Sequence, residues 1–294
     1  MRIAANLLRI VFFSFLLQAA SASGQQGVDL SALSEHQRAL LNEHVYGGLP
    51  DSSHIYIRNA YVSSYNPEYR VPAWVAYRVV PDYLKTPPRS GKFSRFREAP
   101  DLMYPVIDND YRGLLDSLGY ARGHMVPYGV SGGDRNQDGL YADEDDHDQL
   151  SIFEVNYLSN IAPQNHSEFN GFGGLWYNLE RFIQDSLVRG RGMELWIFAG
   201  CLFGPGEVEK VGRQKDIGVP AMFYKIVIHE SDGVPRVLAF LFPHQRTAHG
   251  EIQNFLVSID VIEQLTGLDF FHEWEDGFER EFERQDTWRF WGSL

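Results

Sequence analysis

Apolar residues along the 294-residue chain form short runs that alternate with polar, glycine-containing segments. Runs rich in β-branched and aromatic residues predict strands at residues 55–63, 73–80, 195–199, 223–228 and 237–242. Apolar positions three or four residues apart predict helices at residues 33–44, 175–187 and 255–265. Strands and helices in this mixed order, without an internal repeat or a second hydrophobic unit, predict an α+β domain with a central antiparallel sheet and flanking helices.

The first 22 residues have a different pattern from the rest of the chain. Arg2 and Arg9 supply positive charge before an apolar stretch at residues 10–17, and small residues follow at 20–22. These features together predict a cleaved signal peptide, although a short buried helix would also fit the apolar stretch alone. We therefore expect a secreted or periplasmic protein. Its expected parts are a signal peptide (1–22), a lead-in (23–52), one domain (53–275) with an acidic insertion (131–149), and a C-terminal tail (276–294).

Composition and charge narrow the class of protein. Hydrophobic residues make up 44% of the chain, which excludes a disordered protein. The single cysteine, Cys201, excludes internal disulfides and cysteine-rich zinc modules. No uncharged apolar run reaches the roughly 18–20 residues of a membrane span, so we expect none. The net charge of −13 argues against a protein that coats nucleic acid, but residues 134–148 and 273–286 each hold seven acidic residues, so a polyanionic substrate is not excluded.

Residues suited to phosphodiester hydrolysis occur between Arg122 and Glu180. His124 can act as a general base near neutral pH, Asn160 and Asn170 offer amide oxygens to a hard cation, and Glu180 offers a carboxylate. Taken singly, each has a simpler explanation: a loop histidine, turn-forming asparagines and a solvated helix face. Together they predict that His124 deprotonates water while one divalent ion stabilises the leaving oxygen and Arg122 faces the phosphate.

Three sequence blocks carry these residues. They are residues 122–127 (RGHMVP), 157–164 (YLSNIAPQ) and 176–180 (WYNLE). The blocks resemble the DNA/RNA non-specific endonucleases with a ββα-metal finger, a family of secreted bacterial nucleases and mitochondrial relatives. Further similar segments occur in the same order between residues 53 and 272. The resemblance implies a ββα-metal-finger active site, Mg²⁺ or Mn²⁺ as cofactor, and DNA and RNA as substrates cleaved without sequence preference.

The resemblance also implies roles for the matching residues. His124 would be the general base that activates water, and Asn170 would be the one direct protein ligand of Mg²⁺. Glu180 would hold water molecules of the ion's shell, and Asn160 would help to orient the site. Arg122 would contact or neutralise phosphate.

Basic residues upstream and two departures from the family pattern affect substrate binding. Arg95 or Arg97 is expected to contact the substrate phosphate. Ala121 stands where the family often has Asp, and Gln184 stands where an arginine often follows Glu180 by one turn. We expect Ala121 to tune the site, and Gln184 to remove one phosphate contact.

The spacing of the proposed metal ligands departs from the family pattern as well. Asn170 precedes Glu180 by ten residues, two more than expected. On one continuous helix, about 100° per residue would place the two side chains about 80° apart. We therefore expect residues 171–174 to form a bulge before a shorter helix, and we retain Asn165 as the alternative ligand.

A second metal pattern lies in the acidic insertion. Asp134, Asn136 and Asp138 alternate along the chain, Gly139 permits a sharp turn, and Asp145 stands at the twelfth position. This matches the template of a calcium-binding loop. The alternative is a solvated acidic loop, because the last ligand is Asp instead of Glu and no clear helix precedes it. A bound Ca²⁺ would be structural and would brace the segment between the two catalytic blocks.

Two other functions fit parts of the sequence. A catalytically silent nuclease-like domain could bind nucleic acid or another polyanion, but such a domain has no chemical reason to keep His124, Asn160 and Glu180 together. A phosphodiesterase for small nucleotides would need a closed pocket instead of an open groove. Nothing in the sequence indicates an oligomeric state.

Overall fold

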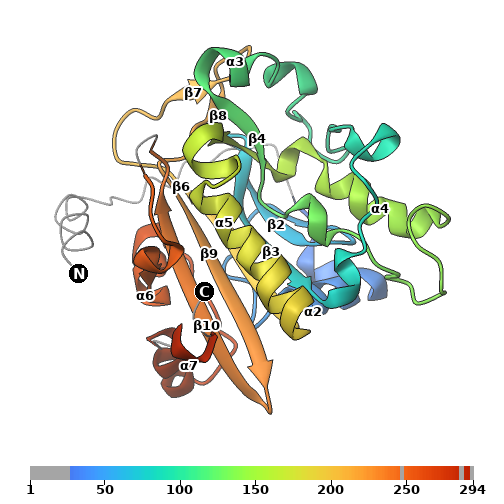
Figure 1. The fold of residues 1–294 in the computed structure, drawn as a ribbon, viewed down its shortest axis with the longest axis vertical. Helices are drawn as coiled ribbons and strands as arrows, with labels where there is room; N and C mark the ends of the chain where they lie inside the picture. Colours follow the sequence, from blue (N-terminus) through green and yellow to red (C-terminus); the bar gives the residue numbers. More distant parts are fainter. Residues whose placement is uncertain (1–26, 246–247, 285–287, 292–294) are drawn as a thin grey trace.

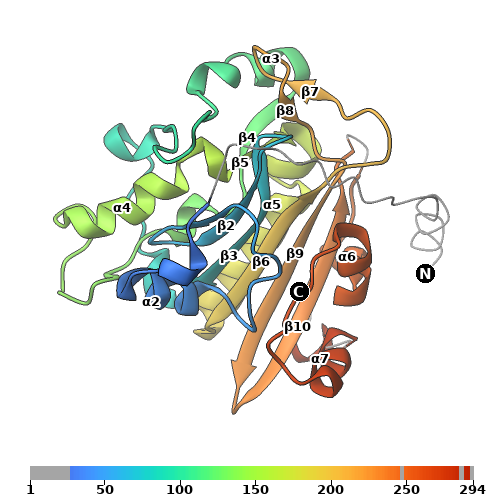
Figure 2. The same ribbon diagram turned by 180° about the vertical axis from the view of Figure 1, so that it is seen from behind.

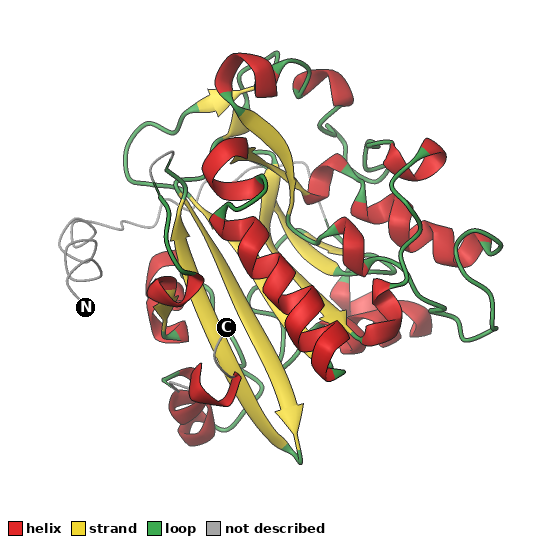
Figure 3. Ribbon diagram, viewed as in Figure 1, coloured by secondary structure: helices red, strands yellow, loops and turns green. Residues whose placement is uncertain are grey.

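The centre of the protein is a seven-stranded sheet in which every neighbouring pair of strands is antiparallel (Figure 1 and Figure 3). The computed structural model describes residues 27–245, 248–284 and 288–291, so the predicted signal peptide lies outside the described residues. In spatial order the strands are β1 (Ile55–Ile57), β2 (Val62–Asn66), β3 (Val71–Val79), β6 (Leu195–Leu202), β9 (Met222–Ser231), β10 (Val234–Pro243) and β11 (Leu256–Val257).

The sheet is buried on both faces, which explains the continuous apolar runs of its strands. Successive side chains of a strand point to opposite faces. On β3, Val75, Tyr77 and Val79 belong to one hydrophobic cluster, and Trp74 and Ala76 belong to another. The sheet therefore separates two cores, and each face needs its own cover of helices.

Helices cover both faces of the sheet (Figure 1 and Figure 2). One face carries α5 (Leu175–Arg181) and its π-helical continuation (Phe182–Arg189). The opposite face carries α2 (Glu35–His44), α6 (Ile259–Thr266) and α7 (Asp276–Glu283). No helix in the described ranges is long and apolar enough to cross a membrane.

The remaining helices and strands lie outside this central layer. They are α3 (Leu114–Leu118), β4 (Tyr120–His124), α4 (Asp146–Val155), β5 (Ile161–Asn165), β7 (Lys210–Val211), β8 (Ile217–Gly218) and α8 (Trp288–Trp291). Short 3₁₀ turns occur at Leu30–Ala32, Pro81–Leu84, Gly91–Ser94, Asp108–Asp110, Tyr128–Val130, Leu158–Asn160 and Ile252–Phe255.

The antiparallel pair β4–β5 and the helix α5 form a ββα unit against the sheet. His124 at the end of β4 pairs with Ile161 at the start of β5. A π-helical turn, His166–Asn170, follows β5 and leads into α5. The predicted fold class, an α+β domain with a central antiparallel sheet and a ββα unit, is confirmed.

Most predicted elements are present, and two boundaries were wrong. Residues 55–63 form two strands instead of one, because the chain turns between them with a hydrogen bond from Arg58 N to Tyr61 O of 2.8 Å. The helix predicted at 255–265 begins only at Ile259, since Leu256 and Val257 pair with β10 at the sheet edge. The expected break at residues 171–174 is confirmed, and α5 begins directly after it.

Candidate active site

His124 ends β4 with its imidazole ring partly exposed. The Phe96 ring lies beside it, with ring centroids 5.4 Å apart and planes 32° apart. Its Nε2 atom lies 3.2 Å from Oδ1 of Asn156, which follows the last turn of α4. An aromatic ring on one side and an amide on the other therefore fix the orientation of the imidazole.

The amide of Asn156 also determines which ring nitrogen of His124 carries hydrogen. Asn156 is fully buried, and its Nδ2 donates to the carbonyl oxygens of Phe93 and Ile152, both at 3.1 Å. Its Oδ1 is therefore the acceptor that faces His124, and Nε2 of the histidine must be the donor. The lone pair of the neutral ring is then on Nδ1, which is the atom able to take a proton.

The surroundings of His124 keep it neutral. Its pKa is lowered to about 3, chiefly by burial and next by the positive charge of Arg89, while the hydrogen bond with Asn156 acts in the opposite direction. The Arg89 guanidinium lies 4.9 Å from the centroid of Phe96 and 5.4 Å from that of Tyr128. A base that is unprotonated at neutral pH is ready to accept a proton.

Asn160 holds the backbone that follows His124. The Asn160 side chain is fully buried and bonds to both backbone groups of Val126 at 3.0 Å, and it donates to the Val155 carbonyl at 2.8 Å. Its own carbonyl accepts from Met125 N at 3.0 Å. These bonds tie the β4 end to α4 and β5, so Asn160 orients the site through the backbone.

Gln164 connects β4 to the predicted metal ligand. The fully buried Gln164 side chain lies across Gly123, where an added Cβ would come within 2.1 Å of the amide. Gln164 Oε1 accepts from Asn170 Nδ2 at 2.7 Å. This bond uses the amide nitrogen of Asn170, so its oxygen is the atom left for a cation.

Asn165, the alternative ligand, has a different task. Its Oδ1 accepts from Glu168 N and from Ser167 Oγ, both at 3.1 Å, and so caps the π-helical turn after β5. This cap and the hydrogen bond of Asn170 favour Asn170 as the ligand.

Glu180 faces the sheet from α5 and meets a buried lysine. Lys225 on β9 is fully buried, and its Nζ lies 3.3 Å from Glu180 Oε1 and 3.9 Å from the Trp176 ring centroid. Burial raises the pKa of Glu180, and the charge of Lys225 opposes that rise. The lysine thus favours the ionised carboxylate, the form that can hold a cation or its water.

Arg122 is paired in the structure. Its guanidinium donates to the carboxylate of Asp108 at 2.7 Å and lies 5.1 Å from the Phe96 ring centroid. The Asp108 side chain is 56% exposed, so this ion pair lies in contact with solvent. An exposed pair of this kind is weak, and a phosphate can replace the carboxylate.

Arg95 and Arg97 differ in their surroundings. Arg97 donates to the carbonyl oxygens of Arg95 at 2.6 Å and Lys92 at 2.7 Å, and its guanidinium lies 4.0 Å from the Phe153 ring centroid. Arg95 is exposed. Arg97 therefore shapes the loop, while Arg95 extends toward solvent where a phosphate can reach it.

The four side chains predicted for calcium lie together in the acidic loop. Asp134 accepts from the backbone of Asp138 at 3.0 Å and from that of Gly139 at 2.8 Å. Asn136 Nδ2 lies 3.1 Å from Asp138 Oδ2 and 3.2 Å from Asp145 Oδ2. The loop is thus folded around its own polar side chains, and its acidic groups could hold a metal ion.

The sequence reasoning missed four residues that position the site: Arg89, Asn156, Gln164 and Lys225. Lys225 had a detectable signal, since it is a lone charge in the apolar strand MFYKIVI. Gln164 belongs to the sequence block 157–164, but its contact with Gly123 is visible only in the folded protein. Asn156 and Arg89 had no local signal, because their importance comes from contacts with residues far away in the chain.

Known proteins show clear similarity to this chain. A model of the DNA/RNA non-specific endonuclease family matches residues 42–277. Nuclease C1 of Cunninghamella echinulata var. echinulata is 31% identical over 226 residues, which cover 73% of this chain and 81% of the relative. The nuclease of Serratia marcescens is 29% identical over 218 residues, which cover 72% of this chain and 73% of the relative.

A solved structure has the same fold. A chain in the crystal structure of the EndoG/EndoGI complex superposes with a TM-score of 0.64 at 24% identity, covering 83% of this chain and 94% of that chain. Fold, site and similarities define the class of protein, a nuclease of the hydrolase type. The chain belongs to the DNA/RNA non-specific endonuclease family. The predicted family and enzyme class are therefore confirmed.

The contact between Gly123 and Gln164 yields a first prediction. Gly123→Ala places a Cβ about where the Gln164 amide now lies, so Gln164 must move and release Asn170. We expect a loss of stability of about 1–3 kcal/mol, as for other overpacked sites, together with loss of nuclease activity. Thermal melting and DNA digestion measure both effects.

Gly277→Ala is the matched control, since a Cβ there meets nothing within 4 Å. Full activity and an unchanged melting temperature in Gly123→Ala would contradict the proposed contact.

The ion pair of Lys225 with Glu180 yields a second prediction. Lys225→Met leaves the Glu180 carboxylate, whose side chain is 20% exposed, without its counter-charge, and we expect a cost below the about 3–5 kcal/mol of a fully buried unpaired charge. Because Lys225 lowers the pKa of Glu180, its removal raises that pKa, and the acid limb of the pH–activity profile moves to higher pH. Lys210→Met, which removes an exposed lysine, is the control for the loss of one positive charge. A profile that stays in place would show that the ionisation of Glu180 does not matter for activity.

Proposed function

We propose that the protein is an exported, metal-dependent endonuclease that hydrolyses phosphodiester bonds of DNA and RNA without sequence specificity. The observation that carries the proposal is the fixed ring of His124, whose Nε2 is committed to Asn156 and whose Nδ1 is left as the base. On the same ββα unit, Asn170 and Glu180 supply oxygen donors.

The donor atoms fit a hard divalent cation. Mg²⁺ and Mn²⁺ prefer oxygen ligands and retain part of their water shell. The hydrogen bond from Asn170 to Gln164 uses the amide nitrogen and leaves the amide oxygen of Asn170 available. Glu180 supplies a carboxylate from α5, the helix of the same ββα unit. These two residues would hold the ion, which when bound supplies positive charge to stabilise the leaving oxygen.

The chain's own residues perform the remaining work. His124 Nδ1 takes a proton from the attacking water, and the bond from Nε2 to Asn156 keeps the ring in place during the transfer. Arg122 and Arg95 offer positive charge to the phosphate. Contacts of this kind are made to the backbone of the nucleic acid and carry no base information, which accounts for cleavage without sequence preference.

The export part of the proposal rests on residues 1–22 of the sequence. A positively charged start, an apolar stretch and small residues at 20–22 are typical of a secretory signal. A mitochondrial leader is amphipathic and rich in Arg and Ser instead. We further propose that residues 53–275 form the catalytic domain, preceded by the lead-in and followed by the tail.

Digestion of plasmid DNA and of RNA tests the catalytic proposal. With Mg²⁺ the protein should degrade both polymers, and EDTA should stop the reaction. His124→Ala should reduce turnover by at least about 10²-fold, the low end of a general-base contribution, while leaving folding nearly intact. The exposed His36→Ala is the matched control. Near-normal turnover in His124→Ala would remove His124 as the base, and no cleavage by the folded protein would favour a silent polyanion-binding domain.

The depressed pKa of His124 gives a pH prediction. Since the protonated ring cannot act as a base, the acid limb of kcat/KM should lie below the ordinary histidine value of 6.5. Arg89→Gln removes a charge that lowers this pKa, so the limb should move to higher pH. For stability, the unfolded chain binds this proton more readily, so the contribution is present above about pH 6.5 and is lost as the pH falls toward about 3.

Arg38→Gln is the control for this measurement, because it also removes an exposed positive charge but lies outside the proposed site and is not among the groups that shift the pKa of His124. If the acid limb of kcat/KM lies at the same pH in the wild type and in Arg89→Gln, a group other than His124 determines the pH of that limb.

A further inference from the structure

The acidic loop leads directly into a helix at its C-terminal end. Asp145, the last of the predicted calcium ligands, is the N-cap of α4 and accepts from the backbone of His147 at 3.0 Å and Asp148 at 3.1 Å. Gly139 has φ of 91°, the left-handed conformation that the sharp turn of such a loop requires. A helix that follows the twelfth position is the arrangement found in calcium-binding loops.

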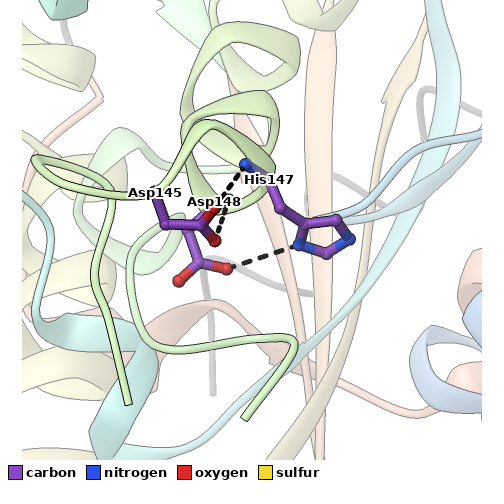
Figure 4. Close-up of side chains that lie close together, drawn as sticks. All are labelled: Asp145, His147 and Asp148. Carbon is purple, nitrogen blue, oxygen red and sulfur yellow. Dashed lines mark hydrogen bonds and ion pairs between the residues drawn. The ribbon is translucent and has the colours of Figure 1, made fainter. Parts of the chain in front are cut away.

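A fourth carboxylate, and a fifth polar side chain, faces this loop from the first turn of α4. Asp148 is 1% exposed, and its Oδ1 accepts from Arg135 N, within the loop, at 3.0 Å. Its Oδ2 is buried and has no hydrogen-bond partner in the described part of the chain. Figure 4 shows Asp148 beside Asp145 and His147, whose ligand atoms all lie within 4.8 Å of one another. A buried carboxylate oxygen without a donor is costly unless a cation satisfies it.

The one arginine of the loop does not neutralise these carboxylates. The guanidinium of Arg135 points into the body of the protein, where it donates to the carbonyl oxygens of Gly132, Asn59 and Val130 at 3.0–3.2 Å. It also lies 3.8 Å from the ring centroid of Tyr83. Arg135 thus anchors the loop to the protein. His147 Nδ1 lies 3.6 Å from Asp148 Oδ1, but the imidazole supplies positive charge there only when it is protonated, and the contact does not involve Oδ2 of Asp148. A site with several carboxylate ligands favours Ca²⁺, which takes six to eight oxygen ligands, over the smaller Mg²⁺.

The other end of α4 reaches the catalytic histidine. The helix runs from Asp146 to Val155, and the next residue is Asn156, whose Oδ1 lies 3.2 Å from His124 Nε2. The loop and the base are therefore connected by one ten-residue helix. Any change that shifts or frays α4 also shifts the amide that fixes the ring of His124.

We propose that the loop from Asp134 to Asp148 is a Ca²⁺ site, with Asp148 as an additional ligand, and that the bound ion stabilises α4 and thereby the position of Asn156 against His124. The ion takes no part in the chemistry. Only the effect on turnover rests on the proposed function, since Ca²⁺ binding by the loop is independent of catalysis.

Calcium binding is tested on the full chain after removal of metals with EDTA and dialysis. Ca²⁺ should bind in isothermal titration calorimetry and should raise the melting temperature. Asp148→Asn should abolish both effects, and it should still fold because the asparagine Oδ1 can accept from Arg135 N as the aspartate does. The double variant Asp134→Ala/Asp138→Ala should behave in the same way. Glu144→Gln, an exposed acidic residue of the same loop outside the donor set, is the matched control.

No rise in melting temperature in the wild type, or an equal rise in wild type and Asp148→Asn, would overturn the site. Ca²⁺ that binds at Asn170 and Glu180 acts on both proteins alike, so the difference between them reports the loop alone.

Coupling to the active site is tested by DNA digestion in saturating Mg²⁺ with a small amount of Ca²⁺. Asp148→Asn should lower kcat about tenfold with KM for DNA unchanged, because misplacing a base by a fraction of an ångström affects the chemical step more than binding. Glu144→Gln should match the wild type. Ca²⁺ binding with an unchanged kcat in Asp148→Asn would overturn the coupling. A wild type that binds Ca²⁺ but cleaves nothing would refute the proposed function and leave the site standing.

Discussion

The hydrogen bond between His124 Nε2 and Asn156 Oδ1 is the contact on which the proposed catalytic arrangement depends. It works only because the Asn156 amide is held by two backbone carbonyls and cannot rotate to offer a donor. The buried amide thereby fixes both the orientation of the ring and the position of its proton. The Asn160 side chain binds the backbone of Val126, just after β4, and the carbonyl of Val155 at the end of α4. Two buried asparagines thus hold the proposed base and the backbone beside it in place.

A second constraint comes from the sheet. Because both faces of the sheet are buried, a charged side chain on a central strand must find its partner within the protein. Lys225 on β9 forms an ion pair with Glu180 on α5, and this pair connects the helix of the ββα unit to the centre of the sheet. A buried ion pair contributes little net stability compared with apolar packing. Its main effect here is that Lys225 opposes the rise in the pKa of Glu180 that burial causes.

Much of the fold was predictable because local patterns reflect burial. Runs of apolar residues marked the strands β3, β6, β9 and β10, and helical spacing marked α5. The strand at 55–63 was predicted too long, since composition does not reveal a turn that depends on the bond from Arg58 to Tyr61. Among the candidate residues, Arg95 and Arg97 looked equivalent in the sequence. Only the fold separates them, because the loop carbonyls bind Arg97 and leave Arg95 exposed.

The sequence by itself determined the types of side chain and their order: a histidine, then an acidic loop, then amides and a carboxylate. Tertiary structure alone decided which of these groups act on one another. Asn156 lies 32 residues from His124 and Lys225 lies 45 residues from Glu180, so no periodicity links the members of either pair. Periodicity reports which face of an element is buried, whereas the partner of a buried polar group is set by how separate elements pack.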